Sequence, residues 1–247
     1  MRRLLILIAL IAMGQTALQA QIGEHRNDLS VGVNGGYVMS NVKFSPKVQQ
    51  GQHGGITGGL AMRYVCEKYF KTIASVYAEV NYASLGWKEK ILDRSNQPVI
   101  NKVTGLPEDY SRTINYIQVP VMAHLAWGRE HKGLNFFVNL GPQFGVYMSE
   151  STKTNFNLAD RNTDDRVSTV VAQDTMAVQN KFDYGIAVGL GAEYSIPKAG
   201  HILVEARYYY GLGNIYGDSK RDFFGSSNFG NIVIKAAYLF DITKTKK

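Results

Sequence analysis

Hydrophobic and polar residues alternate with a period of two along most of the chain after residue 28. In Tyr184–Tyr194 every second residue is Tyr, Ile, Val, Leu or Ala, and the residues between them are Gly, Ala and Glu. This pattern is typical of a β-strand whose two faces meet different surroundings. Seven further segments show the same alternation, and we expect strands there as well: residues 29–39, 56–64, 72–84, 117–127, 134–146, 202–210 and 232–240.

The links between these segments alternate in length. Short links lie at residues 66–71, 128–133 and 197–200, and long polar ones lie at 41–53, 88–112, 149–181 and 213–228. Strands of about 9–13 residues, joined by short periplasmic turns and long extracellular loops, are typical of outer-membrane barrels. We therefore expect an all-β fold, an eight-stranded antiparallel transmembrane up-and-down β-barrel. An even number of strands places both termini in the periplasm.

The first twenty residues have the order of a secretory signal peptide. Arg2 and Arg3 precede the apolar run Leu4–Met13, and small residues occur in Thr16–Ala20. The apolar run is too short to cross a bilayer. We expect a signal peptide at residues 1–20 and the barrel at residues 21–247, located in the outer membrane.

The composition of the two strand faces indicates which one meets lipid. One face carries Val, Ile, Leu, Ala and Tyr, and the other carries mainly Gly, Asn, Gln and single charges. A soluble barrel around a ligand would instead show dense charges to water. Outer-membrane lipid is therefore the expected partner of the apolar face. Aromatic residues near the strand ends predict two interfacial girdles: Tyr64, Trp127, Phe136, Tyr194 and Phe240 at the periplasmic rim, and Tyr37, Tyr82, Trp87, Tyr116, Tyr147, Tyr184 and Tyr210 at the outer rim.

Two prolines conflict with a continuous ladder of hydrogen bonds. Pro120 and Pro142 each lie within a predicted strand and lack the backbone N–H that a ladder uses. We expect both of them at bulges or near strand ends.

Six charged residues fall on the inward face of the predicted strands. Unpaired charges in a narrow lumen would be costly, so we expect a paired network that plugs the barrel. A path for protons or ions is the alternative interpretation. The network consists of Arg63, Glu79, Glu193, Glu205, Arg207 and Lys235.

No arrangement of residues indicates catalysis, a cofactor or a metal. The five His residues are scattered, and the single Cys66 cannot form an internal disulfide. The segment Asp160–Asp164 begins like a calcium loop, but Asp165 and Val171 stand where that loop needs Gly and Glu. The formal net charge is +7, but the basic residues are interleaved with acidic ones. They therefore form no continuous basic face for a nucleic acid. We expect no enzyme activity, no cofactor, no nucleic-acid partner and no small-molecule substrate.

Three segments resemble the PorT-like outer-membrane β-barrel family. They are the opening strand Ser30–Gly36, the tyrosine-to-proline strand Tyr116–Met122 and the Gly-Pro strand Asn139–Gly145. The resemblance implies an eight-stranded barrel from a Bacteroidetes-type bacterium. It also implies an accessory role in type IX protein secretion, with other proteins of the secretion machinery as partners. Gln118 stands where the family often has Glu.

Four functions are therefore considered. The first is the accessory role in export of surface proteases and adhesins, and the second is surface adhesion or envelope stabilisation through loops 88–112 and 149–181. A small-solute pore is less favoured, because eight strands leave room only for side chains. An outer-membrane enzyme is also less favoured, since His53 is the only His placed near an outer loop.

Overall fold

The computed structural model describes residues 23–128, 132–217, 219 and 222–245. The predicted signal peptide therefore lies outside the described residues. The described part contains two single-turn 3-10 helices, η1 (Leu158–Asp160) and η2 (Ala172–Asp174), and no helix in it is long and apolar enough to cross a membrane. Its strands are β1 (Glu24–Ser45), β2 (Gln50–Gly51), β3 (His53–Tyr69), β4 (Thr72–Glu89), β5 (Tyr110–Gly128), β6 (Gly133–Thr154), β7 (Phe182–Ile196), β8 (Gly200–Gly211) and β9 (Ser226–Thr243).

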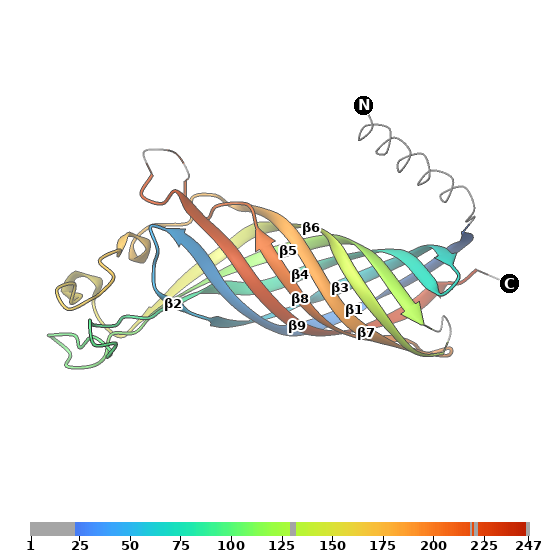
Figure 1. The fold of residues 1–247 in the computed structure, drawn as a ribbon, viewed down its shortest axis with the longest axis horizontal. Coiled ribbons are helices and arrows are strands. Elements are labelled where there is room, and N and C mark those ends of the chain that lie inside the picture. Colours follow the sequence, from blue (N-terminus) through green and yellow to red (C-terminus); the bar gives the residue numbers. More distant parts are fainter. Residues whose placement is uncertain (1–22, 129–131, 218, 220–221, 246–247) are drawn as a thin grey trace, which may run out of the picture.

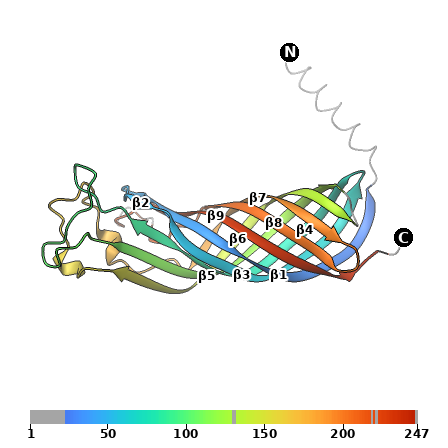
Figure 2. The same ribbon diagram turned by 90° about the horizontal axis from the view of Figure 1, so that it is seen from below.

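The eight long strands form one closed antiparallel ring. Each pairs with the next along the chain, β9 pairs with β1, and β4 pairs with β5. Closure gives every strand two neighbours, which satisfies the backbone where no water is present. Figures 1 and 2 show a tilted barrel whose long links gather at one end, while β1 begins and β9 ends at the other. The predicted eight-stranded antiparallel barrel is confirmed, with β2 as a short addition.

The apolar face of the strands points outward, as predicted. On β7, Val188 and Leu190 are 42% and 62% exposed, whereas the alternate residue Ala187 is 0% exposed. On β4 the side chains that point away from the lumen are apolar from Val76 to Tyr82. Further along the strand, the same face carries the polar Ser84 and Lys88. The lipid band therefore ends near Tyr82 on this strand.

The strands continue past the lipid band, so several predicted boundaries are wrong. The link predicted at residues 88–112 is shortened by β4 and β5 to residues 90–109, and β6 takes up the first six residues of the link at 149–181. Likewise β1 spans 22 residues rather than the predicted 29–39. The pairing and inward packing persist beyond the membrane, but the apolar outward residues stop with the lipid.

The prolines do not lie at bulges, contrary to expectation. Pro120 pairs with Gln143 and Pro142 pairs with Ile186. Pairs are missing beside the prolines, between Pro120 and Ala123 on the β6 side and between Gln118 and Val121 on the β4 side, but the register is the same before and after each gap. The irregularities near these strands fall elsewhere, for example between Asn115 and Tyr116. The neighbouring pairs on each strand hold the register, so each proline costs a ladder bond without shifting the strand.

Three members of the predicted outer girdle point into the barrel. Trp87 is 0% and Tyr116 is 1% exposed, and Tyr147, which pairs with Tyr116, is partly buried against the core. Tyr37 and Tyr82, by contrast, are outward and half-exposed. The position of a residue in the strand alternation decides its face, and these three aromatics occupy inward positions. The girdle prediction is therefore wrong for these three residues.

A charge placed at the middle of the lipid face should destabilise the barrel. We expect Val188→Arg to lower the free energy of unfolding by about 2–4 kcal/mol, because this face has no water to solvate the guanidinium. Urea unfolding in lipid vesicles would measure the loss. The control Ser84→Arg, on the same outward face but past the lipid band, should change stability by less than about 1 kcal/mol.

Candidate functional site

The six charged residues predicted for the lumen all point inward, and none is more than 5% exposed. Such deep burial requires each charge to find a partner, because an isolated ion in a medium of low dielectric is very costly. They come from five strands: Arg63 on β3, Glu79 on β4, Glu193 on β7, Glu205 and Arg207 on β8, and Lys235 on β9.

Four of the six form one cluster centred on Arg207. Its Nη1 lies 2.9 Å from Glu79 Oε2, and its Nη2 lies 2.9 Å from Glu205 Oε2. Lys235 Nζ contacts Glu79 Oε1 and lies 3.5 Å from Glu205 Oε2. Because β8 and β4 are not neighbours in the ring, the pair of Arg207 with Glu79 crosses the lumen.

The other two charges form a second crossing pair. Arg63 Nη1 lies 2.6 Å from Glu193 Oε2, which joins the non-neighbouring strands β3 and β7. His201 Nδ1 lies 2.6 Å from Glu193 Oε1, and His201 Nε2 lies 3.0 Å from Asp241 Oδ1. The lumen is thus crossed by ion pairs in two separate clusters.

Buried amides connect to the charges and fill the remaining space. Asn34 donates to Asn81 over 2.8 Å, and Asn81 donates to Glu79 over 2.7 Å. On the other side Asn139 donates to Glu205 over 3.0 Å and contacts the His124 ring over 2.7 Å. These residues were not predicted as part of the network, although their inward positions in the alternation could have indicated it.

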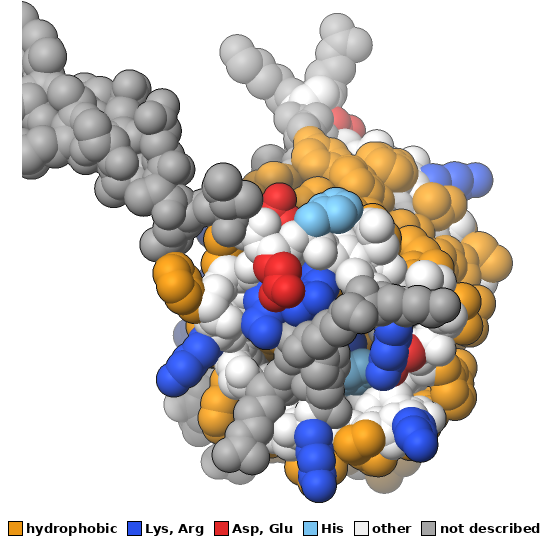
Figure 3. All heavy atoms as spheres, turned by 90° about the vertical axis from the view of Figure 1, so that its right-hand side faces the viewer, with side chains coloured by type: hydrophobic (Ala, Val, Ile, Leu, Met, Phe, Trp, Pro, Cys, Tyr) orange, Lys and Arg blue, Asp and Glu red, His pale blue; other side chains and the backbone are white. Residues whose placement is uncertain are grey.

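A small cavity of about 40 Å³ lies at the end of the barrel where β1 begins. Arg63, His124, Glu193, His201 and Asp241 are among its lining residues. Figure 3 faces this end and shows acidic and basic side chains around the centre, with hydrophobic ones along the circumference. A space of this size holds a few water molecules and leaves no path for larger solutes.

Ser195, His201 and Asp241 lie in the order of a catalytic triad. Ser195 Oγ is 3.0 Å from His201 Nδ1, and His201 Nε2 is 3.0 Å from Asp241. However, Glu193 contacts the same Nδ1, and Ser195 is 1% exposed. A base already held by two carboxylates, beside a buried hydroxyl, does not meet the geometric requirements for nucleophilic catalysis.

His53 lies apart from any such arrangement. Its Nε2 is 3.2 Å from the hydroxyl of Thr113, and no acid is placed against it in the described part of the chain. The same described residues contain no group of three or more His, Cys, Asp or Glu side chains that could hold a metal.

The long links form an ordered cap over the opposite end of the barrel. Its apolar part is a cluster of buried rings in which Phe44 lies 5.2 Å from Trp87 and 4.8 Å from Phe224, centroid to centroid. Tyr216, 0% exposed, stacks on Phe224 at 5.6 Å. The cap therefore has a hydrophobic core, and this core is continuous with the interior of the barrel.

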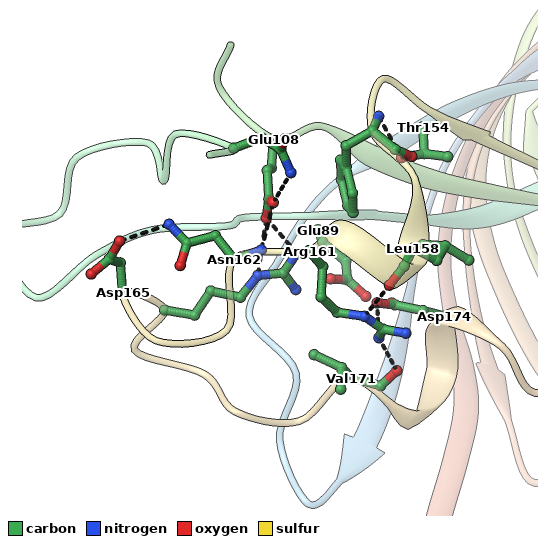
Figure 4. Close-up of polar contacts among 12 residues, drawn as sticks. Glu89, Glu108, Thr154, Leu158, Arg161, Asn162, Asp165, Val171 and Asp174 are labelled. Carbon is green, nitrogen blue, oxygen red and sulfur yellow. Dashed lines mark hydrogen bonds and ion pairs between the residues drawn. The ribbon is translucent and has the colours of Figure 1, made fainter. Parts of the chain in front are cut away.

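A buried polar network ties the link between β6 and β7 to the rest of the cap (Figure 4). Arg166 donates to Glu108 over 2.6 Å, and Arg161 Nη1 lies 2.9 Å from Asp174. Gln173, 0% exposed, donates to Glu89 over 2.7 Å. The sequence patterns missed these residues, because they lie in links where no alternation indicates which side chains are buried.

Arg112 connects this link to the barrel wall. From an inward position on β5 it donates to the carbonyl of Gln173 over 3.0 Å and to that of Met176 over 2.5 Å. It also pairs with Glu150 of β6 at 2.6 Å. The link is thereby held across the opening of the barrel.

Two carboxyl groups of the cap are buried against each other. Glu89 is 7% and Asp174 is 5% exposed, and both lie beyond the lipid band. Burial, and after it the charge of Asp174, raises the pKa of Glu89 to about 8, and burial also raises the pKa of Asp174. At neutral pH this pair therefore retains a proton.

The family to which the chain belongs follows from a comparison with known proteins. A family model described as "Outer membrane protein beta-barrel domain" matches residues 19–217. The chain belongs to this family. It is an outer-membrane β-barrel, and the match is to this broad family rather than to its PorT-like members in particular.

Solved structures of small outer-membrane barrels are similar at low identity. Ail of Yersinia pestis is 13% identical, covering 85% of this chain and 98% of that chain, with a TM-score of 0.34. OprG of Pseudomonas aeruginosa is 13% identical, with 88% and 98% covered and a TM-score of 0.38. Neisserial surface protein A is 11% identical, with 85% and 96% covered and a TM-score of 0.38. No curated protein matches the chain, and likenesses this weak carry no functional argument.

Removal of the central cation of the lumen should be strongly destabilising. In Arg207→Met, Lys235 is the one cation left to Glu79 and Glu205 in this cluster, and we expect a loss of about 3–5 kcal/mol of unfolding free energy. The double variant Arg207→Met/Glu205→Gln should recover part of the loss, because one uncompensated carboxylate is gone. Urea unfolding in vesicles measures both, and equal stability of the single variant and the wild type would contradict the network.

The cap should be more stable at acidic than at alkaline pH. An acid whose pKa is raised on folding, here from 4.5 to about 8 for Glu89, binds more protons in the folded state. Its stabilising effect is complete below pH 4.5 and is lost as the pH rises towards 8. Hydrogen exchange in residues 170–176, corrected for intrinsic rates, should therefore be faster at pH 9 than at pH 6. Glu89→Gln should weaken this dependence, and an unchanged pH dependence would contradict the assignment.

Proposed function

We propose that this barrel is a non-enzymatic protein that acts as an outer-surface docking platform for other proteins. The observation that carries the proposal is the lumen, which ion pairs between non-neighbouring strands cross at Arg207–Glu79 and Arg63–Glu193. A closed lumen argues against solute passage. The protein would then act through the surfaces that lie outside the lipid band.

The proposal includes an orientation in the membrane. The links at the end where β1 begins and β9 ends are short, and those at the other end are long and form the cap. Short turns face the periplasm and long loops face outward in outer-membrane barrels. Both termini are accordingly assigned to the periplasm and the cap to the outside.

The specific role that we propose first is accessory to type IX protein secretion. It is supported by the resemblance of Ser30–Gly36, Tyr116–Met122 and Asn139–Gly145 to PorT-like barrels. These segments lie in β1, β5 and β6. Other proteins of the secretion machinery would then be partners of the cap or of the periplasmic turns.

Adhesion or envelope stabilisation is the second candidate, favoured by apolar side chains at the tip of the cap. Val103 is 72% and Leu106 is 56% exposed in the link between β4 and β5. Exposed apolar side chains on a rigid support are common at protein contact sites. The double variant Val103→Asp/Leu106→Asp should leave folding unchanged and should abolish adhesion if this candidate is correct.

Two assays test the proposed function directly. The purified barrel should give no steady current in planar bilayers, and a large current would contradict the closed lumen. Deletion of the gene should reduce export of surface proteins, with the intact gene restoring it. Normal export with lost cell attachment would select the adhesion candidate, and normal results in both would overturn the docking platform.

A further inference from the structure

One strand edge outside the lipid band has no partner. The pairing of β6 with β7 ends at Val146 and Phe182, after which Tyr147 N–H donates to the carbonyl of Lys181 over 2.8 Å. Yet β6 continues to Thr154, still paired with β5. No backbone hydrogen bond from the described residues reaches the far edge of β6 beyond Tyr147.

The link that follows β6 leaves this edge uncovered. Before it enters β7, the link turns towards the link between β8 and β9, where the N–H groups of Gln179 and Asn180 both donate to the carbonyl of Ile215 over 3.1 Å. In Figure 2 the outer ends of β5 and β6 project together beyond the ring. Most side chains from Ser149 to Thr154 are exposed.

Three other strand edges at this end are covered, each by a different means. The side-chain amide of Gln50 bonds both the N–H and the carbonyl of Val42 in β1, at 3.1 and 2.6 Å, as a neighbouring strand would. The short β2 pairs with the outer end of β4. On β9, Ser227 accepts from the N–H of Ile215 over 2.9 Å. The open edge of β6 is therefore a local exception in a fold that covers its edges.

The direction of the free backbone groups follows from the ladder. Asn155 N–H donates towards β5, to the carbonyl of Asp109 over 3.4 Å. Hydrogen-bonding direction alternates along a strand, so the N–H groups of Glu150, Thr152 and Thr154 point to the free edge. Three donors and their carbonyls are thus aligned for an incoming strand.

We propose that the edge of β6 from Ser149 to Thr154 binds an extended segment of another polypeptide as an additional β-strand. Only an extended backbone offers donors and acceptors at the spacing of this edge. The side chains of the edge are small and polar apart from Glu150, which pairs with Arg112, and Lys153. They fit a Ser- and Thr-rich segment with an acidic residue near Lys153.

A second copy of the chain fits this edge less well. Two copies in one membrane are related by an axis along the membrane normal, so their tilted β6 edges would cross instead of running side by side. Crossing edges could form few backbone pairs, whereas a free extended segment can follow the edge along its length. The inference rests on the proposed docking function and names the element that performs it.

A synthetic peptide tests the inference without knowledge of the natural partner. The probe is an eight-residue Ser/Thr peptide with one central Glu. Its control is N-methylated at every residue, because methylation of alternate residues would leave one edge of the peptide free to pair. We expect the probe to slow hydrogen exchange at Glu150, Thr152 and Thr154 by at least about tenfold, and the methylated control to have no effect. Exchange in β7 serves as the internal reference.

Two variants at one position make the test specific. Thr152→Pro removes the central free donor and leaves the ladder with β5 intact, whereas Thr152→Val changes the side chain and keeps the donor. Protection by the probe should vanish in the first and persist in the second, with folding checked by unfolding in urea.

The inference would be overturned if the probe slowed hydrogen exchange equally in both variants, or not at all in the wild type. It would also be overturned if exchange slowed with rising barrel concentration in the absence of peptide, because a second copy would then occupy the edge. These results are independent of the export and adhesion assays. Failure of the inference about the β6 edge can therefore be told apart from failure of the proposed docking function.

Discussion

The structure depends on the requirement that every backbone group in lipid has a hydrogen-bond partner. Eight strands meet it by closing into a ring through the pairing of β9 with β1 and of β4 with β5. A ring of this size leaves an interior only as wide as side chains. The charges in that interior must then pair with one another, and Arg207 and Glu79 do so across the lumen.

The interior and the cap together direct function to the outer surface. Crossing ion pairs close the lumen, and the ring cluster around Phe44 with the network around Glu108 makes the links a firm cap. A rigid cap presents its surface without paying the entropy of ordering loops on contact. This rigidity is what a docking platform requires.

Beyond the lipid band the backbone requirement relaxes, because water can satisfy open edges. Most outer edges are nonetheless covered, by Gln50 on β1, by β2 on β4 and by the link between β8 and β9 on β9. The free backbone groups on the edge of β6 cost little free energy, because water can hydrogen-bond to them. They also remain able to pair with another strand. The same chemistry that closes the ring in lipid is thus available for contact outside it.

The sequence by itself determined the strand alternation, the outward face and the six lumen charges, because a period of two directly separates lipid from interior. It could not assign Arg207 to Glu79 or Arg63 to Glu193, since those strands meet only once the ring closes. Nor could it place Trp87 inside, extend β6 to Thr154 or bury Glu89 against Asp174. Past the lipid the outward residues become polar, so the pattern fades while pairing and packing continue, and only the tertiary structure decides which groups meet.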